Sequence, residues 1–140
     1  GNVTGAGTGM TWLTGYPFAV NFSRGYPRYS PGEFSAVDVL VRDEADAALV
    51  VASDPAATFP AAAADRFAQI STIVIDPQFS ATAQMAQVYI PSASAGIAAS
   101  GTAYRMDGVP LPLRKLVDSE YPDDRQILNR IEEGVRQCST

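Results

Sequence analysis

The sequence predicts an α/β domain built on a short, mainly parallel β-sheet. Two apolar runs, Ala47–Ala52 and Ile73–Ile75, are each followed by an acidic residue and a proline, Asp54-Pro55 and Asp76-Pro77. An alanine-rich segment between the runs is long enough for a helix. Continuous apolar runs without alternation are typical of strands that are covered on both faces. Strand, helix and strand therefore form a βαβ unit, whose crossover is right-handed in about 98% of proteins.

Composition narrows the function classes before any motif is considered. The 140 residues suit one domain, and their net charge of -5 includes no clustered basic stretch, so nucleic acid is not an expected partner. The chain has no histidine and one cysteine, Cys138, which removes Ser-His-Asp triads, internal disulfides and cysteine-rich metal sites. No apolar run approaches the length of a membrane span, and no signal peptide is recognisable. A cytoplasmic protein without membrane insertion is expected.

Residues 1–33 are predicted to be a glycine- and tyrosine-rich loop segment that precedes a single α/β domain at 34–140. The segment holds GNVTGAGTGM and SRGYPRYSPGEF, and no sustained hydrophobic period runs through it. Loops of this length are uncommon in compact domains unless they are functional or disordered. We therefore expect this segment to line a site or to pack against another part of the protein.

The elements of the α/β domain follow from periodicity and from turn and cap residues. Ser80 is a suitable N-cap, Met106-Asp107-Gly108 is a hairpin turn signal, and Ile127 and Ile131 lie on one face of a terminal helix. The result is a Rossmann-like three-layer domain with a β-hairpin and a C-terminal helix. In chain order, the predicted elements are a helix at 34–42, a strand at 47–52, a crossover helix at 60–70, a strand at 72–75, a helix at 81–86, a strand at 88–90, a hairpin within 97–117 and a helix at 123–135.

Asp54 and Asp76 are the candidate binding residues that the strand pattern itself indicates. Each follows one of the two parallel strands, so both lie at the same edge of the sheet. In open α/β sheets, ligands bind in the crevice outside the carboxyl ends of the strands. A structural alternative stays open for both residues, because an aspartate at the end of a strand also caps the turn that follows it.

Several strings, taken together, resemble one enzyme family. The chain is similar to the B subunit of formylmethanofuran dehydrogenase, a protein related to molybdopterin oxidoreductases. It is also similar to the corresponding subunit of the formyltransferase/hydrolase complex of methylotrophs. The similarity extends over nearly the whole chain. Its strings are GNVTGA (1–6), TGYPFAV (14–20), FSRGYPRYSPGEF (22–34), ASDP (52–55), VIDP (74–77) and GTAYRMDGVPLPLRK (101–115).

The resemblance implies a role in an enzyme larger than this chain. Full-length members hold tungsten or molybdenum between two molybdopterin guanine dinucleotides, contain an iron–sulfur cluster, and couple CO2 and formate chemistry to formyl transfer. This chain would be the C-terminal portion of such a subunit. It would be inactive alone, with no catalytic residue, metal ligand or cofactor of its own. Its partners would be the N-terminal half of the subunit and the other subunits of the complex.

The cofactor-binding residues that the resemblance implies come from three segments. Ser53 and Asp54 match the loop after the first strand, and Asp76 matches the aspartate that recognises guanosine after the second strand. An ionised carboxylate only accepts hydrogen bonds, so it suits ribose hydroxyls or the N–H edge of guanine. Ser80 and Thr82 match the turn beside Asp76. The glycine loop at 1–9, with Gly5 and Gly7, would approach the cofactor.

Two departures from the family pattern keep other functions open. Members usually have aspartate where Gln87 stands, and a glutamate within the stretch that reads Ala98-Ala99-Ser100 here. The loss of two carboxylates favours a non-redox scaffold subunit of a formyltransferase/hydrolase complex in tetrahydromethanopterin-linked C1 metabolism. A third alternative is a small α/β nucleotide-binding module without a link to C1 chemistry.

Overall fold

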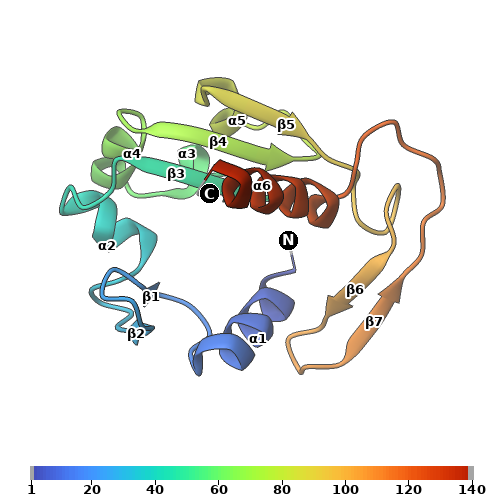
Figure 1. Ribbon diagram of the computed structural model, residues 1–140, viewed down its shortest axis with the longest axis horizontal. Helices are drawn as coiled ribbons and strands as arrows, with labels where there is room; N and C mark the ends of the chain where they lie inside the picture. Colours follow the sequence, from blue (N-terminus) through green and yellow to red (C-terminus); the bar gives the residue numbers. More distant parts are fainter. Residues whose placement is uncertain (1, 139–140) are drawn as a thin grey trace.

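A three-stranded parallel sheet forms the centre of the chain, as predicted. The computed structural model describes residues 2–138. The strands β3 (Ala47–Val51), β4 (Ser71–Asp76) and β5 (Val88–Pro91) lie in the order β3-β4-β5. The register pairs Val51 with Ile75 and Ile75 with Ile90, so all three strands end at the same edge. Figure 1 shows α3, α4 and α5 behind this sheet and α6 in front of it.

The helices of the α/β part begin and end where local signals place them. α2 starts after Ser35, whose hydroxyl and the Asp38 carboxylate form a capping box. The Ser80 hydroxyl accepts a hydrogen bond from the Ala83 N–H and caps α5 as predicted. The crossover helix predicted at 60–70 is present as the helix that begins after Pro60, and a second short helix, which was not predicted, precedes it. The helices are α2 (Ala36–Val41), α3 (Pro55–Thr58), α4 (Ala61–Phe67), α5 (Ala81–Met85) and α6 (Asp124–Cys138).

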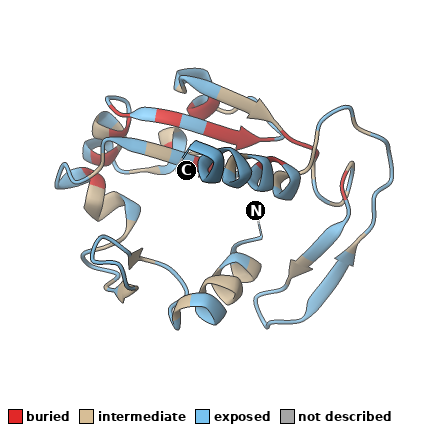
Figure 2. Ribbon diagram, viewed as in Figure 1, coloured by how far each residue is buried: buried red, intermediate tan, exposed pale blue. Residues whose placement is uncertain are grey.

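The hydrophobic core lies between the sheet and the helices of one face. Phe67 of α4 packs edge-to-face on Phe59, and the fully buried Val74 lies at the middle of β4. Figure 2 shows that buried residues concentrate along β4, the central strand. The core cluster is made of Leu40, Val50, Ala63, Phe67, Ile70, Val74 and Ala83.

The first segment is not a loop, so that prediction is wrong for residues 3–14. These residues form the helix α1 (Val3–Thr14). The Asn2 side chain accepts a hydrogen bond from the Gly5 N–H at the start of the helix, and Gly15 ends it at φ 83°. None of the helix residues is buried. Residue 1 of the predicted segment lies outside the described residues.

The rest of the N-terminal segment is a short ribbon held by aromatic contacts. β1 (Val20–Asn21) pairs antiparallel with β2 (Arg28–Tyr29). The Tyr29 ring stacks on Tyr16 at 5.0 Å between centroids and meets Phe18 edge-to-face. Between Gly15 and residue 33, the only regular elements are these two short strands, and the remainder is irregular, as the predicted loop segment requires.

The predicted hairpin is present, and hydrogen bonds attach the start of α1 to it. β6 (Gly101–Tyr104) pairs antiparallel with β7 (Pro110–Leu113) around the predicted Met106-Asp107-Gly108 turn. Asn2 joins α1 to this hairpin, because its amide donates to the Thr102 carbonyl and accepts from the Tyr104 N–H. Within residues 2–138, no helix combines the length and apolar character that a membrane crossing requires.

Candidate functional site

A cleft of about 500 Å³ opens at the carboxyl ends of β3 and β4. Parallel strands bring their following loops together at this edge, as the βαβ prediction requires. The loop after β3, the loop after β4, the segment after β5 and the start of α6 all contribute to the walls. The lining residues are Asn2, Ala52, Ser53, Asp54, Asp76, Pro77, Gln78, Ser80, Ala93, Ser94, Ala95 and Asp124.

Asp54 joins two loops of the cleft through one carboxylate oxygen. Its Oδ1 accepts from the Thr82 hydroxyl at 2.6 Å and from the Thr82 N–H at 2.9 Å. The Thr82 hydroxyl in turn accepts from the Ala56 N–H at 3.0 Å. The pKa of Asp54 lies below its ordinary value. The main cause is the hydrogen bond from the Thr82 hydroxyl, and nearby backbone N–H groups have a smaller effect in the same direction. Asp54 is therefore an ionised carboxylate at neutral pH.

Asp76 is the most enclosed carboxylate of the cleft, with only 7% of its surface exposed. Its Oδ1 accepts from the Gln78 N–H at 2.8 Å, and its backbone carbonyl accepts from the Tyr89 hydroxyl at 3.0 Å. The pKa of Tyr89 is raised, mainly because the hydroxyl is buried and to a smaller extent because the negative charge of Asp76 is near. Among the described residues, no hydrogen bond reaches the second carboxylate oxygen of Asp76. This oxygen can accept from a ligand while the first oxygen holds the turn.

The other expected cofactor residues fall into two groups. Ser53 and Ser80 line the cleft with Asp54 and Asp76. Thr82 is fully buried, and its hydroxyl is already bonded to Asp54 and Ala56. Thr82 therefore positions Asp54 and cannot itself offer its hydroxyl to a ligand in this conformation.

Gly5 and Gly7 lie in α1 rather than in a loop, and neither lines the cleft. Asn2 does line it, and a Cβ atom at Gly5 would collide with the Asn2 side chain. Gly7 instead borders an apolar hollow between α1 and Phe18. Gly5 therefore affects the cleft only indirectly, because its lack of a side chain leaves space for the Asn2 side chain.

Four polar residues of the cleft were not predicted from the sequence: Asn2, Gln78, Ser94 and Asp124. The Oδ1 atom of Asp124 is buried and has no hydrogen-bond partner among the described residues. Buried polar atoms are nearly always paired, so this unpaired carboxylate oxygen is an exception within the fold. Asp124 is the first residue of α6, and its position in the sequence does not indicate that it lines the cleft at the strand ends.

Ala52 adds a backbone feature to the same cleft. It follows β3 and adopts φ 50°, a left-handed conformation that is uncommon for residues with a Cβ. Such conformations cost about 1–3 kcal/mol and cluster at ligand sites. The turn at Ala52 directs the chain from β3 into the Ser53-Asp54 wall.

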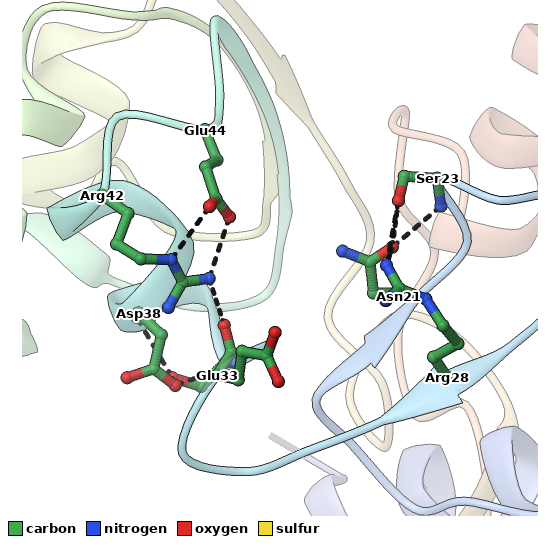
Figure 3. Close-up of polar contacts among 8 residues, drawn as sticks. Asn21, Ser23, Arg28, Glu33, Asp38, Arg42 and Glu44 are labelled. Atoms are coloured by element: carbon green, nitrogen blue, oxygen red, sulfur yellow. Dashed lines mark hydrogen bonds and ion pairs between the residues drawn. The ribbon is translucent and has the colours of Figure 1, made fainter.

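The charge of the cleft is negative. Asp54, Asp76 and Asp124 line it, and no lysine or arginine does among the described residues. Arg28 lies in the N-terminal ribbon, where it donates to Asn21 and Ser23 (Figure 3). The cleft suits neutral or cationic hydrogen-bond donors, whereas a phosphate there would meet three carboxylates.

Arg105 lies in the hairpin, where it pairs with Asp107 at 2.8 Å. Arg28 also stacks over the Phe34 ring, with its guanidinium carbon 4.7 Å from the ring centroid. Both arginines therefore have partners outside the cleft. Among residues 2–138, no group of histidine, cysteine, aspartate or glutamate is arranged to hold a metal ion.

The two departures from the family pattern have different positions. Gln87 precedes β5 at the opposite end of the sheet, and its side-chain carbonyl accepts from the Thr72 N–H. Its lack of charge therefore has no bearing on the cleft, contrary to the expectation. Ala99 and Ser100 line a neighbouring hollow, which shares Asp124 with the cleft.

No protein-family model matches the chain. The chain is 50% identical over 138 residues to the B subunit of tungsten-containing formylmethanofuran dehydrogenase 2 from Methanocaldococcus jannaschii. The match covers 97% of this chain and 32% of that relative. The corresponding protein from Methanococcus maripaludis is 48% identical over 116 residues, which are 83% of this chain and 27% of the relative.

A solved structure extends the similarity to three dimensions. A chain of the formyltransferase/hydrolase complex from Methylorubrum extorquens, determined in complex with methylofuran, superposes with a TM-score of 0.73 at 26% identity. The superposition covers 96% of this chain and 38% of that chain. The chain thus spans about a third of the length of the relatives that it matches. Over that segment, it is a homologue of the B subunit of tungsten-containing formylmethanofuran dehydrogenases.

Proposed function

We propose that this chain provides a guanosine-binding wall for the molybdopterin guanine dinucleotide cofactor in the B subunit of a formylmethanofuran dehydrogenase. The observation that carries the proposal is the cleft at the strand ends, where Asp76 is 7% exposed and keeps one carboxylate oxygen free of hydrogen bonds to the described residues. The homology to tungsten-containing relatives makes this cofactor class the relevant one to test.

The donor and acceptor pattern supports the nucleoside end of the cofactor. Guanine presents N–H groups on one edge and ribose presents hydroxyls, and both can donate to ionised carboxylates. Asp76 supplies such an acceptor through its second carboxylate oxygen, and Asp124 adds a further carboxylate to the lining of the cleft. Since no lysine or arginine of the described residues lines the cleft, the phosphates would extend away from it.

In this proposal the chain binds the guanosine end of the cofactor and takes no part in the redox chemistry. When bound, the pterin-held tungsten or molybdenum would supply redox chemistry, while this chain holds the guanosine end. No residue of the chain is assigned a catalytic role in the proposal. We expect the 140-residue chain alone to show no formate or formylmethanofuran oxidation above background in a dye-linked assay.

The binding test is Asp76→Asn, measured by calorimetric titration with guanosine and GMP. Loss of the negative charge should weaken guanosine binding roughly tenfold or more, since hydrogen bonds to charged groups contribute about 1.5–3 kcal/mol. Asp107→Asn in the exposed hairpin turn is the matched control and should leave the affinity unchanged. Equal binding by the wild type and Asp76→Asn would reduce Asp76 to a turn cap for Gln78.

A non-redox scaffold subunit is the second candidate. The observation that favours it is the superposition, at 26% identity, on a chain of a formyltransferase/hydrolase complex. Metal and pterin analysis of the native assembly separates the two functions. A molar ratio of tungsten or molybdenum to chain near unity supports the cofactor-holding function, and a ratio far below unity supports the scaffold.

A further inference from the structure

The β3 strand has an open edge although it lies in a parallel sheet. Sheet order places β3 at one end, with β4 as its only neighbour among the described residues. The Ala52 N–H donates to the Ile75 carbonyl at 2.9 Å, and the Ser71 N–H donates to the Asp46 carbonyl. Backbone groups alternate in direction along a strand. The N–H and C=O groups of Ala47, Leu49 and Val51 therefore point away from β4, to the open edge.

An apolar groove of about 360 Å³ follows this open edge. Side chains of α2, α4 and the α3–α4 connection form its outer walls, among them Val39, Leu40, Phe59 and Phe67. A row of free backbone groups beside apolar walls is the arrangement that accepts an added strand.

The sheet face opposite the core is also partly bare. The register aligns Leu49, Ile73 and Val88 in one row across the three strands. These side chains are 51%, 39% and 46% exposed, and they border a shallow apolar depression of about 400 Å³. Strands of parallel sheets are normally covered on both faces. The amino-terminal half of this face therefore lacks its cover.

The strand topology explains the open edge and the bare face together. The strands β3, β4 and β5 follow each other in space, and Figure 1 shows the helices between them on one side of the sheet. This order matches one half of a doubly wound sheet, in which the strand order 3-2-1-4-5-6 adds the second half beside the first strand. In such a sheet the helices of the second half lie on the opposite face, where Leu49, Ile73 and Val88 are exposed.

We propose that the open edge of β3 receives a parallel strand from the part of the B subunit that lies outside these 140 residues. The crossover helix that follows this strand covers the Leu49, Ile73 and Val88 row. The length of the relatives identifies the occupant, because the matched segment is only 32% of one relative and 27% of the other. A second copy of the chain fits less well, since two-fold pairing of β3 with itself would be antiparallel and would bring no crossover helix.

Hydrogen–deuterium exchange tests the edge directly. The 140-residue chain is compared with the same residues in the native assembly purified from the host. The Leu49 and Val51 amides should exchange at least about tenfold more slowly in the assembly, while the Val50 amide, which faces β4, is protected in both. Equal exchange of Leu49 and Val51 in the two samples overturns the proposal. Protection that rises with the concentration of the isolated chain would show self-pairing and also overturn it.

A pair of substitutions at one position separates strand addition from general packing. Leu49→Pro removes an outward N–H and leaves the inward ladder to β4 intact, which edge strands tolerate. Leu49→Thr keeps the N–H and the strand preference. In host cells that express a tagged B subunit, Leu49→Pro should reduce recovery of the assembled protein roughly tenfold, and Leu49→Thr should reduce it much less. Equal recovery of both variants and the wild type overturns strand addition at this edge.

Discussion

The contact between Asp54 and Thr82 connects the loops that follow two different strands. The residues are 28 positions apart, and the Asp54 carboxylate accepts both the hydroxyl and the N–H of Thr82. The same hydroxyl accepts from the Ala56 N–H, so one buried side chain of α5 bonds two groups of the segment that follows β3. This contact holds one wall of the cleft in place.

Thr82→Val is expected to destabilise the chain by roughly 1–3 kcal/mol at pH 7, because it takes the hydroxyl partner from Asp54 and from the Ala56 N–H. The isosteric change keeps the volume of the side chain. Urea unfolding monitored by circular dichroism measures the loss in the free energy of unfolding. Thr82→Ser retains the hydroxyl and should recover most of that loss.

The effect of Thr82→Val should also depend on pH. The fold lowers the pKa of Asp54, so its contribution is complete above the unfolded value of about 3.9 and is lost as the pH falls toward the lowered folded value. Removing the hydroxyl raises the folded pKa toward the ordinary range. The difference in unfolding free energy between wild type and variant should therefore shrink below about pH 4. A difference that is constant from pH 7 to about pH 3 would contradict this account.

Residue positions at the cleft could be predicted only where the strand topology determines them. Asp54 and Asp76 follow neighbouring parallel strands, and this alone brings them to one edge. Asn2 and Asp124 come from the two ends of the chain, and no local pattern indicates that they meet there. Which of the predicted side chains bind the cofactor stays a prediction. The motif also did not show that the Thr82 hydroxyl is already bonded to Asp54 and to the Ala56 N–H.

At the scale of elements, α1 shows why a helix can escape sequence analysis. Periodicity arises from a buried face, and no residue of α1 is buried, so the apolar pattern that identifies helices is missing. Its cap signals were present in Asn2 and Gly15. The glycines at positions 5, 7 and 9 obscured them, since each lowers helix propensity by about 1 kcal/mol relative to alanine.

Two glycine substitutions in α1 should act in opposite ways. Gly9→Ala should stabilise the helix by up to about 1 kcal/mol, because open space surrounds a Cβ atom at that position. Gly5→Ala gains the same propensity but displaces the Asn2 side chain that holds α1 to β6. Hydrogen exchange of the α1 amides should slow in Gly9→Ala and accelerate in Gly5→Ala. Slower exchange in both variants would show that Asn2 does not anchor the helix.

The α/β elements were predictable because each has a buried face or a defined cap. The continuous apolar runs at β3 and β4 are strands, and Ser80 caps α5 as its position indicated. The crossover helix predicted at 60–70 is α4, which its alanines favour, and Pro60 precedes it at the N-cap position. The short helix α3, which ends before Pro60, was not predicted.

The largest hydrophobic cluster of the molecule lies on one side of the sheet, and Ile75 of β4 and Ile127 of α6 are buried outside it. Phe67 is buried in that core and contacts Phe59 at 6.2 Å between ring centroids. Other large apolar side chains, such as Trp12 at 79% exposure, contribute little to the stability of the chain by itself. Stability is therefore concentrated between the sheet and the α2 and α4 helices.

Phe67→Ala should destabilise the chain by about 3–5 kcal/mol, which is a large share of the roughly 5–15 kcal/mol typical of whole domains. Phe22→Ala is the size-matched control at an exposed position and should change the unfolding free energy by no more than about 0.5 kcal/mol. Thermal and urea unfolding measure both. Similar losses in the two variants would show that the N-terminal ribbon contributes to the core.

The attachment of α1 by Asn2 has a consequence for the order in which the chain folds. Asn2 bonds Thr102 and Tyr104, which are 100 and 102 positions away in the sequence. During synthesis at roughly 5–20 residues per second, the hairpin leaves the ribosome several seconds after α1. A glycine-rich helix with no buried residue has little reason to persist through that interval. We therefore expect α1 to be the last element to settle, after the sheet has formed and only when the hairpin offers its edge.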